Sequence, residues 1–539
     1  MSGAASTAEA TPAPAPAPPI PFHRVVLYAL ASWTIGLTQG LGTNLVAANI
    51  QAVQATFGAT ANEAAWLTAA YASTSITASL LLYKFRTQFG LRLFAQLGLI
   101  LFAVVSVAHF AANDLRAAVM VRAVAGFAAA PLGTLAFLYM LEVLPPQHKL
   151  TIGVALGLMG AQAAVPLARL VSPHLLELGL WHGLNLLELG LSLVCLAIVF
   201  LLPLTPPPRA KIFDRVDAIS LPLVIVGLGL LSVVLSLGRL YWWLEAPWLG
   251  LYLAGSIACL GLLVAIELNR AQPLINLHWL SSADMILFGG SSFFARFILS
   301  EQTTGAIGFF QNLGLLNEHM AGLFWVILAA TIGAFLLVAF VNRPENVAAI
   351  HATALLLIAV GAWLESHGTS LTRPQDVYLS QALVAFGGAA FLPAALTWSF
   401  GHTLRAGPQY VTSFFAVFLA SQNLGGLLGS AALGSLVTVR EKFHSSQIVE
   451  NLTLSDPIVA QRIGQYGATY ARVLGDATRR NAEGATLLGQ VATREAYVLA
   501  YNDLFLVVSV VAAFCLVGLL VHEFLKALRR RAAARAQAA

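Results

Sequence analysis

Five ionisable side chains lie inside long apolar stretches of this sequence, where a charge is costly. They are Arg122, Glu188, Arg296, Glu301 and Asp503. An ionisable group at the centre of a bilayer costs roughly 2.5 to 3.5 kcal/mol on insertion scales, so such groups usually line water or pair with one another. A buried carboxyl group that takes up and releases protons is also what a proton-driven process requires. The pattern predicts a proton pathway, with structural ion pairs as the alternative.

All but Arg296 fall at a similar depth on one side of the predicted membrane, as a shared pathway would require. Arg296 and Glu301 are five residues apart, about 500° around a helix, so each needs a partner on another helix or water. We predict that Arg122 tunes or releases a proton and that Glu301 carries it. Pro166, in the middle of its apolar stretch, predicts a bend that moves.

Uncharged polar and aromatic side chains in the apolar stretches could form a cavity for an amphipathic solute, or could only join helices by hydrogen bonds. The candidates are Trp33, Gln39, Asn44, Tyr71, Thr74, Gln302, Gln381, Gln422 and Asn423. Small residues at a four-residue spacing mark close helix contacts, which we interpret as a gate between two bundles or as static packing. They are Gly153, Gly157, Ala161 and Ala164, and then Gly425 and Gly429.

The elements that carry these residues are predicted to be membrane helices. The chain of 539 residues is 58% hydrophobic and 10% charged, whereas a soluble domain carries roughly 25% charged residues. Fourteen apolar stretches have about the 20 residues needed to cross a bilayer. The predicted spans are 25-47, 64-83, 93-112, 117-141, 151-172, 184-203, 217-238, 249-267, 285-310, 322-341, 348-365, 377-400, 411-438 and 498-522.

The connecting loops alternate in positive charge. With a cytoplasmic N-terminus, sixteen Lys and Arg residues lie on the inner side and three in the short outer loops. The positive-inside rule therefore predicts a multi-pass membrane protein with both termini in the cytoplasm. The sequence has no phosphate-binding loop, no HExxH and no GxSxG motif, so we expect no enzyme, no cofactor, no metal site and transport driven by an ion gradient.

Several segments resemble the fourteen-helix drug/proton antiporters of the major facilitator superfamily (EmrB/QacA type). The family's fourth-span motif is matched by VRAVAGFAAAPLGTL (121-135), with Arg122 in the key position. The family's next inner loop is similar to PPQHK (145-149), and the segment that leads into its ninth span is similar to PLINLHWL (273-280). The chain departs from the family in YKFRTQFGLR (83-92), which lacks the usual Asp, in GTN (42-44), and in VPLARLVSP (165-173), which has lost the glycines. These losses shift attention to Glu188, Glu301 and Asp503.

The resemblance implies an all-helical facilitator fold of two six-helix bundles plus two inserted helices. We expect a disordered Ala/Pro-rich tail at 1-21, bundles at 22-203 and 276-525, a hinge and the inserted helices at 204-275, and a basic tail at 526-539. The outer loop at 440-497 should be a small structured cap or a partner-docking element, with a solvated insertion without a partner as the alternative.

The predicted function is proton-coupled export of small amphipathic organic compounds or drugs by alternating access. Import of organic or sugar acids is the alternative within transport, and a non-transporting membrane sensor or scaffold is the alternative from another class. The resemblance also implies a bacterial plasma (inner) membrane as the location, and a periplasmic adaptor and an outer-membrane channel as possible partners.

Overall fold

The computed structural model describes residues 21–205, 213–270, 273–407 and 410–538. Within these ranges the chain is helical and contains no strand, which confirms the predicted all-helical class. Thirteen of the described helices are long and apolar enough to cross a membrane. The remaining predicted span, 64-83, lies in α3, a helix of 29 residues that is less apolar because it is rich in Ser and Thr. Two predicted segments lie largely outside the described residues. They are the tail, of which residues 1–20 are not described, and the hinge, of which residues 206–212 are not described.

Six long helices form the first bundle, called here the N-bundle. They are α1 (Phe22–Ala48), α3 (Ala61–Phe89), α4 (Leu91–Ala108), α5 (Leu115–Glu142), α7 (Val154–Gly179) and α8 (Trp181–Leu201), with the short helices α2 (Ile50–Phe57) and α6 (Pro146–His148) between them. Extensive contacts join α1 to α7 and α5, α3 to α5, and α4 to α5 and α8. Polar caps define helix starts: the Thr60 hydroxyl and the Glu63 carboxylate form a capping box at α3, and Asp114 caps α5.

The second six-span group, called here the C-bundle, packs in the same way. Its helices are α12 (Ala283–Leu299), which continues through the π-turn η3 (Glu301–Ala306) into α13 (Ile307–Asn312), then α14 (Ala321–Val341), α15 (Val347–Glu365), α16 (Tyr378–Ala406), α17 (Val411–Glu450) and α19 (Ala477–Ala538). The short elements are α11 (Leu277–Leu280) and α18 (Pro457–Ala468). The predicted ninth span is thus one segment with a π-turn at Glu301, a distortion often found at functional sites.

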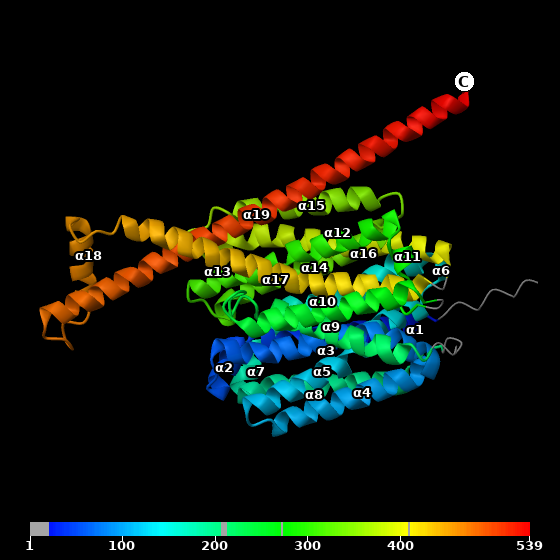
Figure 1. Cartoon of the computed structure of the whole chain (residues 1–539), viewed down its shortest axis with the longest axis horizontal. Coiled ribbons are helices and arrows are strands. Elements are labelled where there is room, and N and C mark those ends of the chain that lie inside the picture. The colour runs from blue at the N-terminus through cyan, green and yellow to red at the C-terminus, as the bar shows by residue number, and fades with distance from the viewer. Residues whose placement is uncertain (1–20, 206–212, 271–272, 408–409, 539) are drawn as a thin grey trace, which may run out of the picture.

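The two inserted helices, α9 (Asp217–Leu237) and α10 (Pro247–Leu268), pack on each other. α9 also contacts α3 of the N-bundle and α17 of the C-bundle, so the inserted pair lies beside both bundles. In Figure 1 the helices run roughly side by side, with the N-bundle in blue and cyan below and the C-bundle in green to red above. The main direct contact between the bundles is made by α7 and α14.

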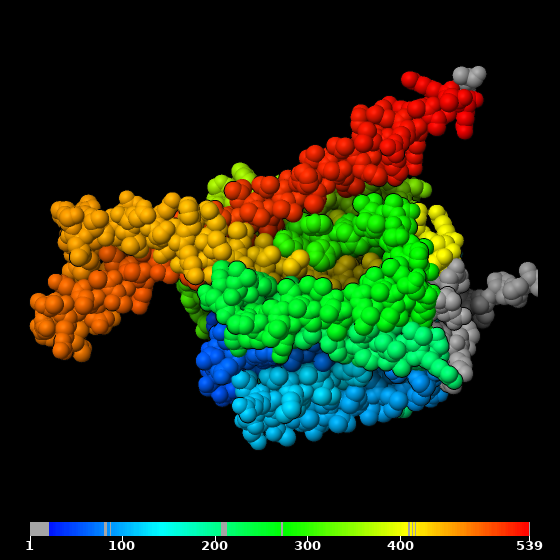
Figure 2. Space-filling model, viewed as in Figure 1, coloured from blue at the N-terminus to red at the C-terminus, as the bar shows by residue number. Residues whose placement is uncertain are grey.

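The predicted outer loop is structured, in agreement with the expectation of a structured cap. Residues 440–497, called here the arm, extend α17 and α19 beyond the bundles and join them through α18, so the segment is a helical hairpin (Figure 1). Val459 and Ile463 of α18 are buried, and Gly484 of α19 packs on the backbone of Ile463. Figure 2 shows the arm projecting from one end of the molecule, called here the arm end.

The opposite end, called here the tail end, holds the start of α1, and α19 projects beyond the bundle there (Figures 1 and 2). The predicted basic tail is helical as far as Ala538, because nothing between Leu525 and Ala538 interrupts the helix and the residues are mostly Ala and Arg, which favour it.

The small-residue stripes pack within bundles, so their interpretation as a gate between bundles is wrong. A Cβ atom on Gly40 of α1 would lie 2.7 Å from the backbone oxygen of Ala161, which shows how closely this stripe of α7 approaches α1. Gly425 and Gly429 face the backbone of α12 in the same way. The sequence predicts which residues make close contacts but not which helix they contact, because small residues occur at any tight helix interface.

Candidate functional site

Two buried glutamates meet in the C-bundle and are called here the carboxyl pair. Glu301 is the first residue of η3, and Glu365 is the last residue of α15; they are 0% and 4% exposed. The side-chain amide of Gln381 on α16 lies between them, and its Nε2 donates to Oε1 of Glu301 at 3.2 Å and to Oε1 of Glu365 at 2.8 Å. The hydroxyl of Ser380 also donates to Oε1 of Glu365, at 2.7 Å. The Oε2 atoms of both glutamates are buried with no described partner.

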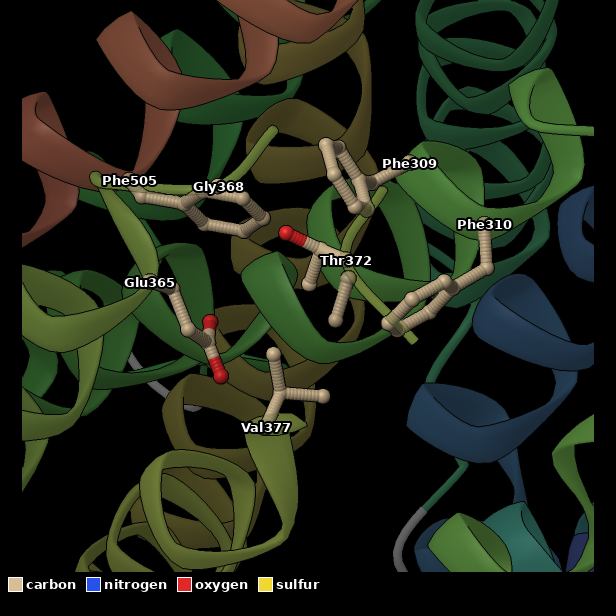
Figure 3. A pocket seen from close by; sticks show the side chains of 8 residues that line it. Phe309, Phe310, Glu365, Gly368, Thr372, Val377 and Phe505 are labelled. Atoms are coloured by element: carbon tan, nitrogen blue, oxygen red, sulfur yellow. The ribbon is translucent and has the colours of Figure 1, made fainter. Parts of the chain in front are cut away.

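This arrangement is suited to holding a proton. Two carboxylates that share one amide donor in a buried site repel each other, and a proton on either of them removes that repulsion. The proton then belongs to the pair and not to one residue. Glu365 also lines a small pocket with three aromatic rings, those of Phe309, Phe310 and Phe505 (Figure 3). The pocket is closed by Gly368, Thr372 and Val377 of the α15–α16 connection, which lies at the arm end.

A second buried charge cluster lies in the N-bundle. Arg122 on α5 is 0% exposed, and its Nη1 lies 3.6 Å from Oε2 of Glu188 on α8. Its Nη2 donates to the backbone oxygen of Gly42 on α1 at 2.9 Å, and its guanidinium carbon lies 4.2 Å from the ring centre of Tyr71 on α3. This arginine of α5 therefore contacts three other helices, through an ion pair, a hydrogen bond and a cation–π contact.

The predicted ionisable residues thus fall into separate clusters. Arg122 and Glu188 pair in the N-bundle, and Glu301 belongs to the carboxyl pair of the C-bundle. Asp503 lies at the base of the arm, where its Oδ2 accepts from Nε of Arg440 and lies 2.6 Å from Nε2 of His444. Its side chain is 30% exposed. The clusters have no described ion pair or hydrogen bond between them, so a single chain of proton-exchanging groups does not connect the predicted residues.

Arg296 and Pro166 have no described polar partner. Arg296 is half-buried on α12, packs against Gly425 and Gly426 of α17, and forms no ion pair with any described carboxylate. It is not paired with Glu301, in agreement with the spacing argument. Pro166 is buried inside α7, which stays helical through it.

The predicted cavity residues are distributed over both bundles. Tyr71 joins the Arg122 cluster, and Gln381 bridges the carboxyl pair. Asn44 and Thr74 bond to backbone oxygens of their own helices. Gln39 lies near Gly133. The remaining four candidates are half-buried along their helices: Trp33, Gln302, Gln422 and Asn423. Nε1 of Trp33 and Nε2 of Gln302 are buried donors without a described partner.

The N-bundle and C-bundle are also joined by polar contacts at both ends. At the arm end, Asn317 of the 3₁₀ turn η4 (Asn317–Met320) accepts from Nη1 of Arg169 at 3.1 Å and donates to the backbone oxygen of Ala48 at 3.0 Å. At the tail end, the hydroxyl of Thr397 on α16 donates to the backbone oxygen of Leu150 at 2.5 Å. In the described residues the two bundles are therefore joined by hydrogen bonds at both ends.

A network of buried charges fixes the inserted helices at the tail end. Nζ of Lys84 on α3 lies 2.8 Å from both carboxylate oxygens of Asp217 on α9, and Nη1 of Arg270 lies 2.8 Å from Oδ1 of Asp217. Nη1 of Arg270 also lies 3.3 Å from Oε1 of Glu267 on α10. Burial would lower the pKa of Arg270, but its hydrogen bonds and charge interactions with Asp217 and Glu267 outweigh burial and raise it.

Two of these residues were missed at the sequence level. Glu365 ends its predicted span, so it resembles an interfacial residue until the packing of α15 on α16 shows that it is buried. Arg169 lies inside the predicted span 151-172, and its position alone could have identified it as a sixth buried charge. Its side chain is 9% exposed.

Comparisons with known proteins agree with this architecture. A model of the Major Facilitator Superfamily matches residues 32–430. The chain is 20% identical over 417 residues to the multidrug export protein EmrB of Escherichia coli K12, covering 75% of this chain and 77% of that protein. It is 21% identical over 514 residues to the protein of the same name from Haemophilus influenzae, covering 90% and 93%. These relatives confirm the resemblance predicted from the motifs.

Solved structures show the same fold. The human organic anion transporter MFSD10 (TETRAN) matches with a TM-score of 0.55 and 15% identity, covering 92% of this chain and 100% of that chain. A double tryptophan mutant of XylE matches with a TM-score of 0.51 and 13% identity, covering 90% and 95%. At these identities the likeness concerns the fold and carries no information on substrates.

Proposed function

Because this chain belongs to the Major Facilitator Superfamily of membrane transporters, we propose that it is a proton-coupled exporter of small amphipathic organic compounds. The observation that carries the proposal is the carboxyl pair, in which Glu301 and Glu365 share the amide donor of Gln381 in a buried site. Multidrug export by the EmrB relatives supports the direction of transport.

In this mechanism the carboxyl pair binds a proton from the outer side and releases it to the cytoplasm. Glu365 lies beside the pocket at the arm end, so it receives the proton first, and Glu301 carries it into the bundle. Without a proton the two carboxylates repel each other. With one proton, the protonated carboxyl group donates a direct hydrogen bond to the other carboxylate. This change at the π-turn of α12 is what shifts the C-bundle relative to the N-bundle.

The inter-bundle contacts at the two ends are the contacts that must alternate. Opening to the outside breaks the Asn317 contact at the arm end, and opening to the inside breaks the Thr397 contact at the tail end. The Thr397 contact is one hydrogen bond between neutral groups, and the Asn317 contact comprises hydrogen bonds to Arg169, Ala48 and Asn49. Each bond contributes about 0.5 to 3 kcal/mol, which is small enough to break in each cycle. In the N-bundle we assign the tuning of a proton to Arg122, which is paired with Glu188.

The arm is placed outside the cell and both termini in the cytoplasm by the positive-inside rule. Apolar side chains remain exposed on the arm: Val449 is 55%, Leu454 77%, Ile458 69% and Val473 82% exposed. We assign these side chains to docking of a periplasmic adaptor that leads to an outer-membrane channel. Loss of co-purification after replacement of Leu454 and Ile458 by Ser, with transport in vesicles unchanged, tests this assignment.

The proposed function is tested by proton release from everted vesicles. A pH-sensitive dye reports the proton gradient while amphipathic cations, neutral compounds and aromatic acids are added in turn. We expect substrate-dependent proton release by the wild type and none by Glu301→Gln or Glu365→Gln. Glu177→Gln is the matched control, since Glu177 is 78% exposed. Release that persists in both pair variants would contradict the proposal.

A further inference from the structure

Arg169 differs from the other buried cations of the protein. Among the described residues, three Lys or Arg side chains fall in the most buried class: Lys84, Arg122 and Arg169. Lys84 lies 2.8 Å from Asp217, and Arg122 lies 3.6 Å from Glu188. Arg169 forms no ion pair with any described carboxylate. A buried cation without a counter-ion is expensive, so its retention indicates a counter-ion that is not part of the protein.

The neighbours of Arg169 are neutral and belong to the opposite bundle. Its Nη1 donates to Oδ1 of Asn317, and its guanidinium carbon lies 5.8 Å from the ring centre of Phe324 on α14. Arg169 itself is on α7, in the arm-end half of the N-bundle. It therefore lies at the seam that must part when the bundles open toward the arm end.

Asn317 joins the two bundles at this seam by hydrogen bonds. Its Oδ1 accepts from Arg169, and its Nδ2 donates to the backbone oxygen of Ala48 at 3.0 Å and lies 3.3 Å from Oδ1 of Asn49. Asn49 is held in turn by Ser172 of α7, since its Nδ2 donates to that hydroxyl at 2.6 Å. Nη1 of Arg169 is bonded to Oδ1 of Asn317, so an anion that pairs with this nitrogen competes with one of the bonds that join the bundles at the arm end.

We propose that Arg169 binds the anionic group of the transported compound and that this binding releases the Asn317 contact. The substrates are then amphipathic organic anions, in which a carboxylate or similar group pairs with the guanidinium and the apolar part lies against Phe324. The site forms as the bundles separate, because its two sides belong to different bundles. The inference rests on the proposed transport function and names its substrate class.

The test is equilibrium binding to the purified full-length chain in detergent. The probes are 1-naphthoate, decanoate and the neutral analogue 1-naphthamide. We expect Arg169→Gln to weaken binding of both acids about ten- to a hundredfold, as loss of a charged hydrogen-bonded pair would. Arg169→Lys should recover part of the affinity. Asn317→Ala should tighten binding of the acids several-fold, because it removes the competing acceptor.

Matched controls make the result decisive. Arg373→Gln removes an exposed arginine at the same end and should leave the affinity unchanged. Binding of 1-naphthamide should be weak in every variant. The inference is overturned if neither acid binds the wild type, if the amide binds as tightly as the acid, or if both Arg169→Lys and Asn317→Ala bind the acids like the wild type. The last comparison remains valid if Arg169→Gln does not fold.

Failure of this inference can be separated from failure of the proposed function. Proton release in vesicles with cations or neutral compounds alone would support proton-coupled export and overturn the anion site. Binding of the acids through Arg169 with no proton release by any compound would support the anion site and overturn proton coupling.

Discussion

The ion pair of Arg122 and Glu188 predicts an unequal response to the removal of its two members. At the observed separation of 3.6 Å, two unit charges interact by about 4 to 5 kcal/mol at an effective dielectric constant of ~20. Glu188→Leu leaves Arg122 charged and buried, because a guanidinium does not lose its proton in proteins. We expect this variant to lose about 3 to 5 kcal/mol of the free energy of unfolding.

Arg122→Met should cost less, since the remaining carboxyl group of Glu188 can become neutral by binding a proton. The double variant Arg122→Met/Glu188→Leu should be within about 2 kcal/mol of the wild type, because neither charge is then left unpaired. The free energies are measured by unfolding in mixtures of SDS and mild detergent. Single losses that simply add up in the double variant would refute the reasoning, as would a wild-type stability in Glu188→Leu.

Three further predictions concern packing and the arm. Asp217→Asn leaves the buried cations Lys84 and Arg270 facing a neutral amide, and it should cost about 3 to 5 kcal/mol of the free energy of unfolding in the same assay. The control is Asp214→Asn, at a side chain that is 52% exposed, which should cost under about 1 kcal/mol. Gly160→Ala should cost about 1 to 3 kcal/mol because the added methyl group meets the backbone of α1, while Gly190→Ala, with open space around it, should cost nothing measurable. Asp503→Ala removes the contacts of Asp503 with Arg440 and His444 at the base of the arm. Limited proteolysis should then cut the arm several-fold faster, with little change in the unfolding of the bundles, and an unchanged cleavage rate would count against this prediction.

The membrane fold could be predicted because its signal is compositional. Apolar stretches of about 20 residues and the loop charges are visible without any knowledge of packing. The Arg122–Glu188 pair was foreseeable for the same reason, since a charge within an apolar stretch stands out. The helical arm was less visible, because helices that continue into water lose the apolar signal that marks a span.

The sequence does not predict which side chains on different helices contact one another. Glu365 is at the end of its span, and only the packing of α15 on α16 brings it to Gln381 and Glu301. Gln381 was expected in a substrate cavity, but it bridges the two glutamates. The residues can be nominated from their types and depth, whereas the pairing depends on helix rotation, which a sequence of small and apolar residues does not fix.

The central claim is that a proton held by Glu301 and Glu365 drives transport, and proton release from everted vesicles tests it most directly. The account predicts that an added substrate releases protons in the wild type and in Glu177→Gln but not in Glu301→Gln or Glu365→Gln. Equal proton release in the wild type and in both pair variants would contradict it.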